Sequence, residues 1–146
     1  MEGGTLAREI DDIAKRKKYK QNQYGDRKSR KDDYTGERVF SGNTEKAIKK
    51  HPIDKISDTD HVTPIKVVQS RYKGLSDDQQ RIIANSEHNY AITNSKLNRS
   101  KGGLENHEYL MRQTLKGENP DLKTSAKMLE KEAESRIAMR VQATAM

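Results

Sequence analysis

The chain has 146 residues and no cysteine. This absence excludes a disulfide framework, a zinc site built from thiolates and a cysteine nucleophile. It is typical of a protein from a reducing compartment. With neither disulfides nor a zinc knuckle available, we expect apolar packing alone to stabilise the fold.

Apolar residues are also scarce. They make up 31% of the chain, against 35% charged residues and a usual globular apolar share of about 45–50%. No run approaches the roughly 20 apolar residues of a membrane-spanning helix, and Met1–Thr5 lacks the apolar segment of a secretory signal. We therefore expect an intracellular, cytoplasmic protein with no membrane partner, a compact middle and charged flanks.

Positive charge is in excess and is clustered. The formal net charge is +7, and Lys15–Lys31 holds nine basic residues and one acid. Such a cluster is typical of a protein that binds a polyanion, although a solvated charged segment gives the same pattern. The candidate nucleic-acid-binding residues here are Lys15, Arg16, Lys17, Lys18, Arg27, Lys28, Arg30 and Lys31.

The first half of the chain predicts short elements. Apolar residues at helical spacing predict a helix from Thr5 to about Lys18, ending before Gly25. A linker follows, and a turn at Thr35-Gly36 indicates a hairpin within 34–42. A short helix over 44–50 precedes a strand that reaches the pair Asp60-His61.

The second half predicts more helix. Ser76 is a candidate helix cap, and 89–93 is a strand candidate followed by a helix that Asn94 caps and Gly102 ends. Two longer helices are expected over 105–116 and 124–144. Ile82 and Ile83 are expected on the buried side of the helix that Ser76 begins, and Tyr109, Leu110 and Leu115 are core candidates of 105–116. The apolar residues of 124–144 are expected to face the core or a partner: Met128, Leu129, Ile137 and Met139.

The most informative feature is a set of polar residues. Asp60-His61 is followed 37 residues later by Asn98, and Asn89 lies between them. A carboxylate beside an imidazole, with a further oxygen ligand, can hold one divalent metal and activate a water against a phosphodiester. An imidazole titrates near neutral pH, as a general base must.

The segment Asp58-Thr59-Asp60-His61-Val62-Thr63-Pro64, followed by Asn89-Tyr90-Ala91-Ile92-Thr93-Asn94-Ser95-Lys96-Leu97-Asn98-Arg99-Ser100-Lys101, resembles an HNH endonuclease. Tyr34-Thr35-Gly36 stands where this family often carries a Tyr-Thr-Gly. The resemblance covers about residues 33–110. It is greatest to the HNH domains of phage enzymes and of CRISPR RNA-guided effectors.

The resemblance implies an α+β fold with a small ββα-metal core flanked by helices. It implies His61 as general base, Asn89 as a residue that orients the His61 side, and Asp60 and Asn98 as ligands of Mg²⁺ or Mn²⁺. Arg99 and Lys101 are candidates for contact with the phosphate. This chain departs from the family in two ways. Many members have His where this chain has Asn98, and many carry paired CxxC zinc knuckles, which this chain lacks.

We therefore expect a basic helical extension over 1–31, an HNH nuclease domain over 32–112 and a C-terminal helical extension over 113–146. The expected activity is metal-dependent hydrolysis of DNA phosphodiester bonds by a one-metal mechanism, in a phage or mobile-element context. The alternative is a catalytically inactive HNH-like module that binds nucleic acid or assembles into a larger complex. A homodimer, or a protein partner on the C-terminal helix, is compatible with either hypothesis.

Overall fold

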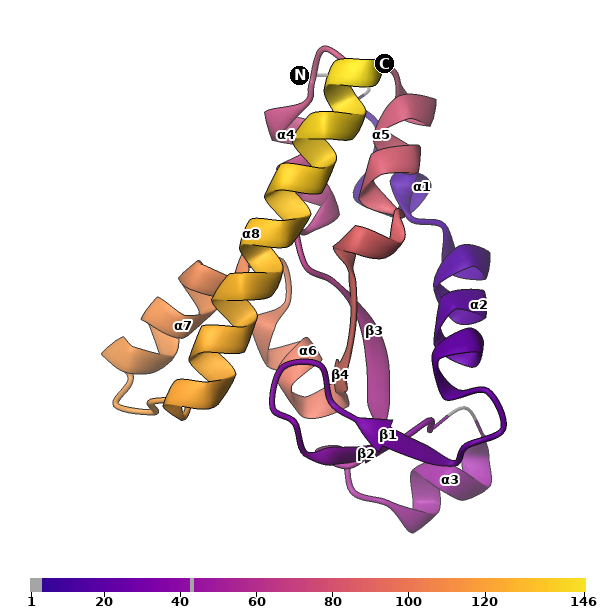
Figure 1. Cartoon of the computed structure of the whole chain (residues 1–146), viewed down its shortest axis with the longest axis vertical. Helices are drawn as coiled ribbons and strands as arrows, with labels where there is room; N and C mark the ends of the chain where they lie inside the picture. Colours follow the sequence, from indigo (N-terminus) through magenta and orange to yellow (C-terminus); the bar gives the residue numbers. More distant parts are fainter. Residues whose placement is uncertain (1–3, 43) are drawn as a thin grey trace.

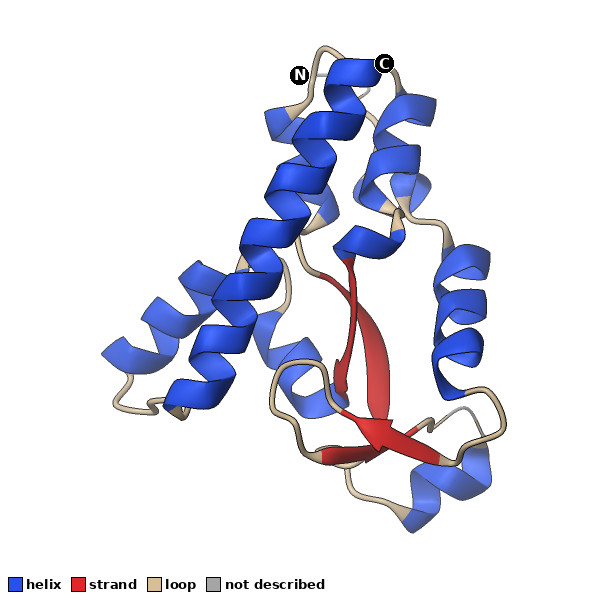
Figure 2. Cartoon of the chain, viewed as in Figure 1, coloured by secondary structure: helices blue, strands red, loops and turns tan. Residues whose placement is uncertain are grey.

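The computed structural model describes residues 4–42 and 44–146, which form a small α+β fold (Figures 1 and 2). Two antiparallel two-stranded sheets lie among the helices. In chain order the elements are α1 (Ala7–Ile10), α2 (Ile13–Tyr24), β1 (Ser29–Lys31), β2 (Arg38–Phe40), α3 (Glu45–Lys50), β3 (Ser57–His61), α4 (Ile65–Arg71), α5 (Asp77–Ala84), the 3-10 turn η1 (Glu87–Asn89), β4 (Tyr90–Asn94), α6 (Ser95–Lys101), α7 (Asn106–Leu115) and α8 (Leu122–Ala145).

A strand–strand–helix unit, β3–β4–α6, lies at the centre (Figure 1). β3 and β4 pair antiparallel, with Ser57 opposite Asn94 and His61 opposite Tyr90. The Asn94 side chain accepts a hydrogen bond from the Leu97 amide and so caps α6 directly after the strand. Gly102, with φ of 53°, ends α6 in the left-handed region that favours glycine. Both the cap and the stop agree with the sequence-based expectation.

A hairpin is present as β1 and β2, but only its turn and second strand lie within the predicted range 34–42. A buried aspartate ties this hairpin to the central unit. Asp32 accepts hydrogen bonds from the Tyr34 and Thr35 amides in the turn. It also accepts from the Thr93 hydroxyl and the Asn94 amide at the end of β4. One carboxylate therefore shapes the turn and fixes it against the strand that leads into α6. β1 lies inside the segment expected to be a linker.

The expected N-terminal helix is two helices. α1 ends at Ile10, because Asp11 has extended backbone angles, and α2 begins with Asp12, whose side chain accepts from the Lys15 amide. The expectation of one continuous helix was wrong here, since an Asp that caps a new helix was counted as interior. α2 runs to Tyr24 and ends before Gly25, as expected.

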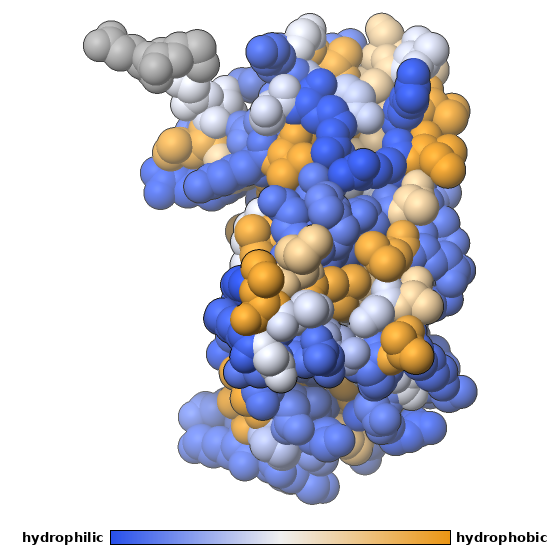
Figure 3. Space-filling view, turned by 90° about the vertical axis from the view of Figure 1, so that its left-hand side faces the viewer, coloured by the Kyte–Doolittle hydropathy of each residue, from blue (hydrophilic) through white to orange (hydrophobic). Residues whose placement is uncertain are grey.

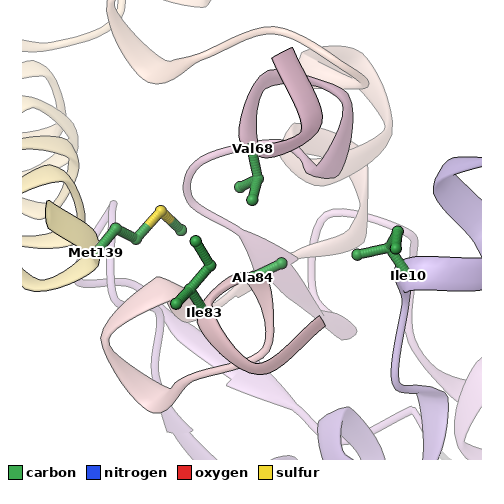
Figure 4. Packing of buried hydrophobic residues seen from close by; sticks show 5 residues of the cluster. All are labelled: Ile10, Val68, Ile83, Ala84 and Met139. Carbon is green, nitrogen blue, oxygen red and sulfur yellow. The ribbon is translucent and has the colours of Figure 1, made fainter. Parts of the chain in front are cut away.

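Both ends of the chain contribute to one core. Ile10 from α1, Val68 from α4, Ile83 and Ala84 from α5, and Met139 from α8 form a buried cluster (Figure 4). A second cluster joins Tyr34, Val62 and Ala91 to helices α7 and α8. The segments expected to be extensions at 1–31 and 113–146 therefore pack into the same body as the central strands.

Two residues expected to be buried are exposed. Ile83 and Tyr109 are buried as expected, but Ile82 and Leu115 are 54% and 80% exposed. On α8, Met128 and Met139 lie in the core, whereas Leu129 and Ile137 are 45% and 66% exposed. Each of these four exposed residues lies on the side of its helix that faces away from the core. On the face that Figure 3 draws, apolar side chains are interspersed with hydrophilic ones.

Apolar packing is not the only source of cohesion. Asp32, Asp60, Asn85, Asn89 and Lys101 are all 5% exposed or less, and each forms hydrogen bonds within the described residues. The expectation that apolar packing alone stabilises the fold was therefore wrong, because buried polar groups carry part of the interior. No helix of the described residues is both long enough and apolar enough to span a bilayer.

Two residues of α8 test this packing. Met139→Ala removes a fully buried side chain from the first cluster and is expected to lower the free energy of unfolding by about 2–5 kcal/mol. Ile137→Ala, on the exposed side of the same helix, should change it by less than about 0.5 kcal/mol. Urea denaturation followed by circular dichroism measures both. Equal losses in the two variants would contradict the assigned packing of α8.

Candidate active site

A cleft of about 510 Å³ opens beside the end of β3. Asp60 and His61 line it from β3, and Asn98 lines it from α6. Asp11 and Arg16 line it from the N-terminal helices. The cleft therefore brings together three of the four residues predicted as the site, with one arginine from the basic segment beside them.

The imidazole ring of His61 is bound through its Nε2 atom. This atom lies 3.0 Å from Asn85 Oδ1 and 3.7 Å from Asp11 Oδ1, and the side chain is 14% exposed. The Asn85 amide nitrogen donates to the Ile10 and Arg81 carbonyls. Its oxygen must therefore be the acceptor facing His61, so the neutral ring carries its proton on Nε2 and keeps a lone pair on Nδ1.

Burial lowers the pKa of His61 below its usual 6.5. The hydrogen bond to Asn85 and the charge of Asp11 act in the opposite direction, and the charge of Arg16 adds to the lowering. The net result favours the neutral imidazole at neutral pH, which is the form that accepts a proton.

Asp60 is buried and tied to two neighbours through one oxygen. Its Oδ2 accepts from the Tyr34 hydroxyl at 2.7 Å and from the Lys101 ammonium at 2.7 Å. Burial raises the pKa of Tyr34 well above its usual range, so its hydroxyl stays protonated and donates. Within the described residues, Oδ1 of Asp60 has no hydrogen-bond partner, which leaves it as the atom able to meet a ligand in the cleft.

Asn98 is oriented by an aspartate that the sequence reasoning missed. The Asn98 amide nitrogen donates to Asp58 Oδ2 at 3.2 Å. The side-chain oxygen of Asn98 is then the atom left for a cation. Asp58 and Asp60 lie two residues apart on β3 and so point to the same face, a strand periodicity that could have identified Asp58.

Asn89 lies outside the cleft and is fully buried. Its oxygen accepts from the Thr63 amide at 2.7 Å and from the Ser135 hydroxyl, while its nitrogen donates to the Thr63 and Ala84 carbonyls. It therefore fixes the loop that follows His61. The residue bonded to the imidazole ring is Asn85, which belongs to no motif, since its bonds to His61 and to Ile10 span 24 and 75 positions of chain.

The predicted nucleic-acid-binding residues occupy different places. Arg16 lines the cleft and forms a two-bond ion pair with Asp11, at 2.8 and 2.7 Å. Arg30 is paired with Asp33 at 2.6 Å. Lys101 is fully buried, and its ammonium donates to Asp60 and to the His61 and Val62 carbonyls, so it has no surface to offer a phosphate. The remaining residues of the set are exposed: Lys15, Lys17, Lys18, Arg27, Lys28, Lys31 and Arg99.

A second group of side chains, Glu105, His107 and Glu132, could hold a metal ion. Burial raises the pKa of Glu105, but hydrogen bonds from Arg136 and Arg71 outweigh it and bring the pKa below its usual value. The two arginines already neutralise this carboxylate. The chain has no cysteine for a zinc knuckle, at this place or any other.

No protein-family model, curated protein or solved structure matches the chain.

The buried ion pair makes a stability prediction. Lys101→Met leaves the Asp60 carboxylate buried without its cation and is expected to lower the free energy of unfolding by about 3–5 kcal/mol. Lys96→Met, on the exposed side of the same helix, should cost less than about 1 kcal/mol. Chemical denaturation at neutral pH compares the two. A loss below about 1 kcal/mol for Lys101→Met would show that Asp60 does not depend on this cation.

The lowered pKa of His61 makes a second prediction. In the metal-free protein, NMR titration of the ring should give a midpoint below 6.5 for His61. The unfolded chain then binds this proton more readily than the folded one, so stability is undiminished above pH 6.5 and falls as pH drops from 6.5 through the folded pKa. In His61→Gln this contribution to the pH dependence should disappear. A His61 midpoint above 6.5 would contradict the described burial.

Proposed function

We propose that the chain is a metal-dependent endonuclease that hydrolyses DNA phosphodiester bonds, with His61 as the general base. The observation that carries this proposal is that Asp60, His61 and Asn98 line one cleft on a β3–β4–α6 unit. The resemblance to the HNH motif implies four residues, of which these three line the cleft, while Asn89 lies outside it.

His61 is suited to take a proton from water. Asn85 holds the Nε2 proton, so Nδ1 carries the lone pair. The His61 ring packs against the Tyr90 ring, with the two centroids 5.5 Å apart and an interplanar angle of 67°. A base must be neutral before it acts, and burial keeps the imidazole in that form. Asn89 is a positioning residue in this scheme, because it fixes the loop directly after His61.

The oxygen atoms fit a hard divalent cation. Asp60 Oδ1 and the Asn98 side-chain oxygen have no hydrogen-bond partner within the described residues, and both side chains line the cleft. A carboxylate and a carbonyl oxygen suit Mg²⁺ or Mn²⁺, which keep several waters of their own. When bound there, such an ion would stabilise negative charge that develops on the phosphate.

Arg16 is suited to bind the phosphate. Asp11 takes its Nε and one Nη proton, and Nη1 has no hydrogen-bond partner in the part of the chain that the structure describes. A guanidinium is planar, and the two bonds to Asp11 fix its orientation. Its remaining donors therefore point in set directions, which favours contact with a phosphate oxygen. The exposed lysines of α2 would add sequence-independent contacts that weaken as salt rises.

A second candidate function is a nucleic-acid-binding module without catalysis. One observation favours it: the Lys101 ammonium lies 2.7 Å from Asp60 Oδ2 and competes with a metal for the same carboxylate. In that case the Asp60–Lys101 pair is structural, and the cleft binds a backbone without cutting it.

Cleavage of supercoiled plasmid separates the two functions. With Mg²⁺ or Mn²⁺ the wild type should nick or linearise the plasmid, EDTA should stop it, and His61→Ala and Asn98→Ala should each slow it by about 100-fold or more. His88→Ala removes an exposed histidine outside the cleft and should cut at the wild-type rate.

Two further results decide the matter. His61→Ala should bind a DNA duplex as tightly as the wild type in EDTA, because the base makes no contact that binding alone requires. Absence of any metal-dependent cutting by folded wild-type protein, with DNA binding retained, would overturn the nuclease and leave the binding module.

A further inference from the structure

A second concave surface lies at the other end of β3. A pocket of about 570 Å³ lies between α3 and the segment that joins α2 to β1. The residues that matter here are Arg27, Lys28, Lys46, Lys50, Phe40 and His51, and we call this surface the basic pocket. Figure 1 shows α3 beside β1 and β2, at the end of the molecule opposite α5.

Among the described residues, four cations and no acid line the basic pocket. Arg27 donates to the Gln23 and Tyr24 carbonyls, which fixes its guanidinium at the end of α2. None of the four cations forms an ion pair within the described residues. The acid of α3, Glu45, is paired with Lys49 instead. Four charges with no counter-charge in one concavity give a strong positive potential.

The wall of this pocket is a stacked pair of rings. Phe40 and His51 lie with centroids 3.9 Å apart and an interplanar angle of 7°. Thr44 caps α3, and His51 directly follows the last residue of that helix. The rings therefore hold the end of α3 against β2, so Lys46 and Lys50 extend from a fixed frame.

The basic pocket is in line with the cleft. α2 begins near Arg16, which lines the cleft, and ends at Tyr24, three residues before Arg27 of the basic pocket. Phe40 pairs with Ile56 directly ahead of β3, and His61 ends that strand. Five residues of extended chain cover roughly 16 Å, which is about five base pairs of duplex at 3.4 Å each. A duplex in the cleft can thus reach the basic pocket.

We propose that the basic pocket is a second nucleic-acid-binding site, which holds backbone phosphates about five base pairs from the phosphate in the cleft. This inference rests on the proposed function for its ligand. The alignment of the two surfaces along α2 and β3 favours a duplex over an acidic protein, since a protein partner would need no such alignment. The site adds affinity and orients the duplex across the cleft.

Charge reversal tests the proposal by binding alone. Lys46→Glu/Lys50→Glu is compared with Lys116→Glu/Lys123→Glu, which makes the same change in net charge at the exposed α7–α8 junction. Fluorescence anisotropy with a 20-base-pair duplex, in EDTA, gives Kd at several salt concentrations. The first variant should bind about tenfold or more weakly, with a salt slope smaller by about two, and the second should stay within about threefold of wild type.

Crosslinking locates the contact. Because the chain has no cysteine, Lys50→Cys carries a single attachment point for a photoreactive group, and Lys116→Cys is the matched control. Labelled Lys50→Cys should crosslink to the duplex and labelled Lys116→Cys should not. Circular dichroism and thermal unfolding of every variant confirm that each is folded before it is compared.

The outcomes separate the two proposals. Equal weakening in the two charge-reversal variants, or crosslinking from position 116 as readily as from 50, would overturn the second site. Unchanged DNA binding in the Lys46→Glu/Lys50→Glu variant would also overturn it and leave an acidic protein as the partner. Binding is measured without metal, so a failure to cut plasmid does not change the result for the basic pocket. Likewise, a failure of the binding test does not decide whether the protein is a nuclease.

Discussion

The contact between Lys101 and Asp60 is the constraint on which the centre of the molecule depends. The ammonium lies 2.7 Å from the carboxylate and also bonds the His61 and Val62 carbonyls, so it joins the last turn of α6 to the end of β3. Taking both charges from water costs several kcal/mol per ion. Tyr34 and the two carbonyls offset that cost with further hydrogen bonds, and the carboxylate keeps one oxygen toward the cleft.

The same polar network explains how a chain with so few apolar residues keeps a defined interior. Asp32 ties the hairpin to β4, Asn89 ties the loop after His61 to α8 through Ser135, and Asn85 ties the imidazole to α1. Each of these side chains uses most of its hydrogen-bonding capacity, which is what makes a buried polar group tolerable. A substitution in such an interior lowers the free energy of unfolding strongly, because it leaves the buried partner of the lost side chain without a hydrogen bond.

Local signals predicted much of this fold from the sequence, and long-range contacts set its limits. Three features depend only on a few neighbouring residues, so the sequence was enough to predict them: the Asn94 cap, the Gly102 stop and the turn at Thr35-Gly36. Asp60, His61 and Asn98 formed a recognisable spacing. Asn85 and Asp11 could not be assigned, because their contacts with His61 join segments 24 and 50 residues away. Lys101 was given an outward role because spacing alone carries no information on burial.

The hydrogen bond between Asn89 and Ser135 sets an order of assembly for the loop beside the cleft. The β3–β4 pairing closes loops of 29 to 37 residues, since His61 pairs with Tyr90 and Ser57 with Asn94. The bonds from Asn89 to Ser135 and from Asn85 to Ile10 close longer loops, of 46 and 75 residues. Long loops lose more entropy on closure and slow the rate at which a chain folds. During synthesis the strands emerge before residue 135 exists, so the loop after His61 is completed only when α8 has left the ribosome and docked.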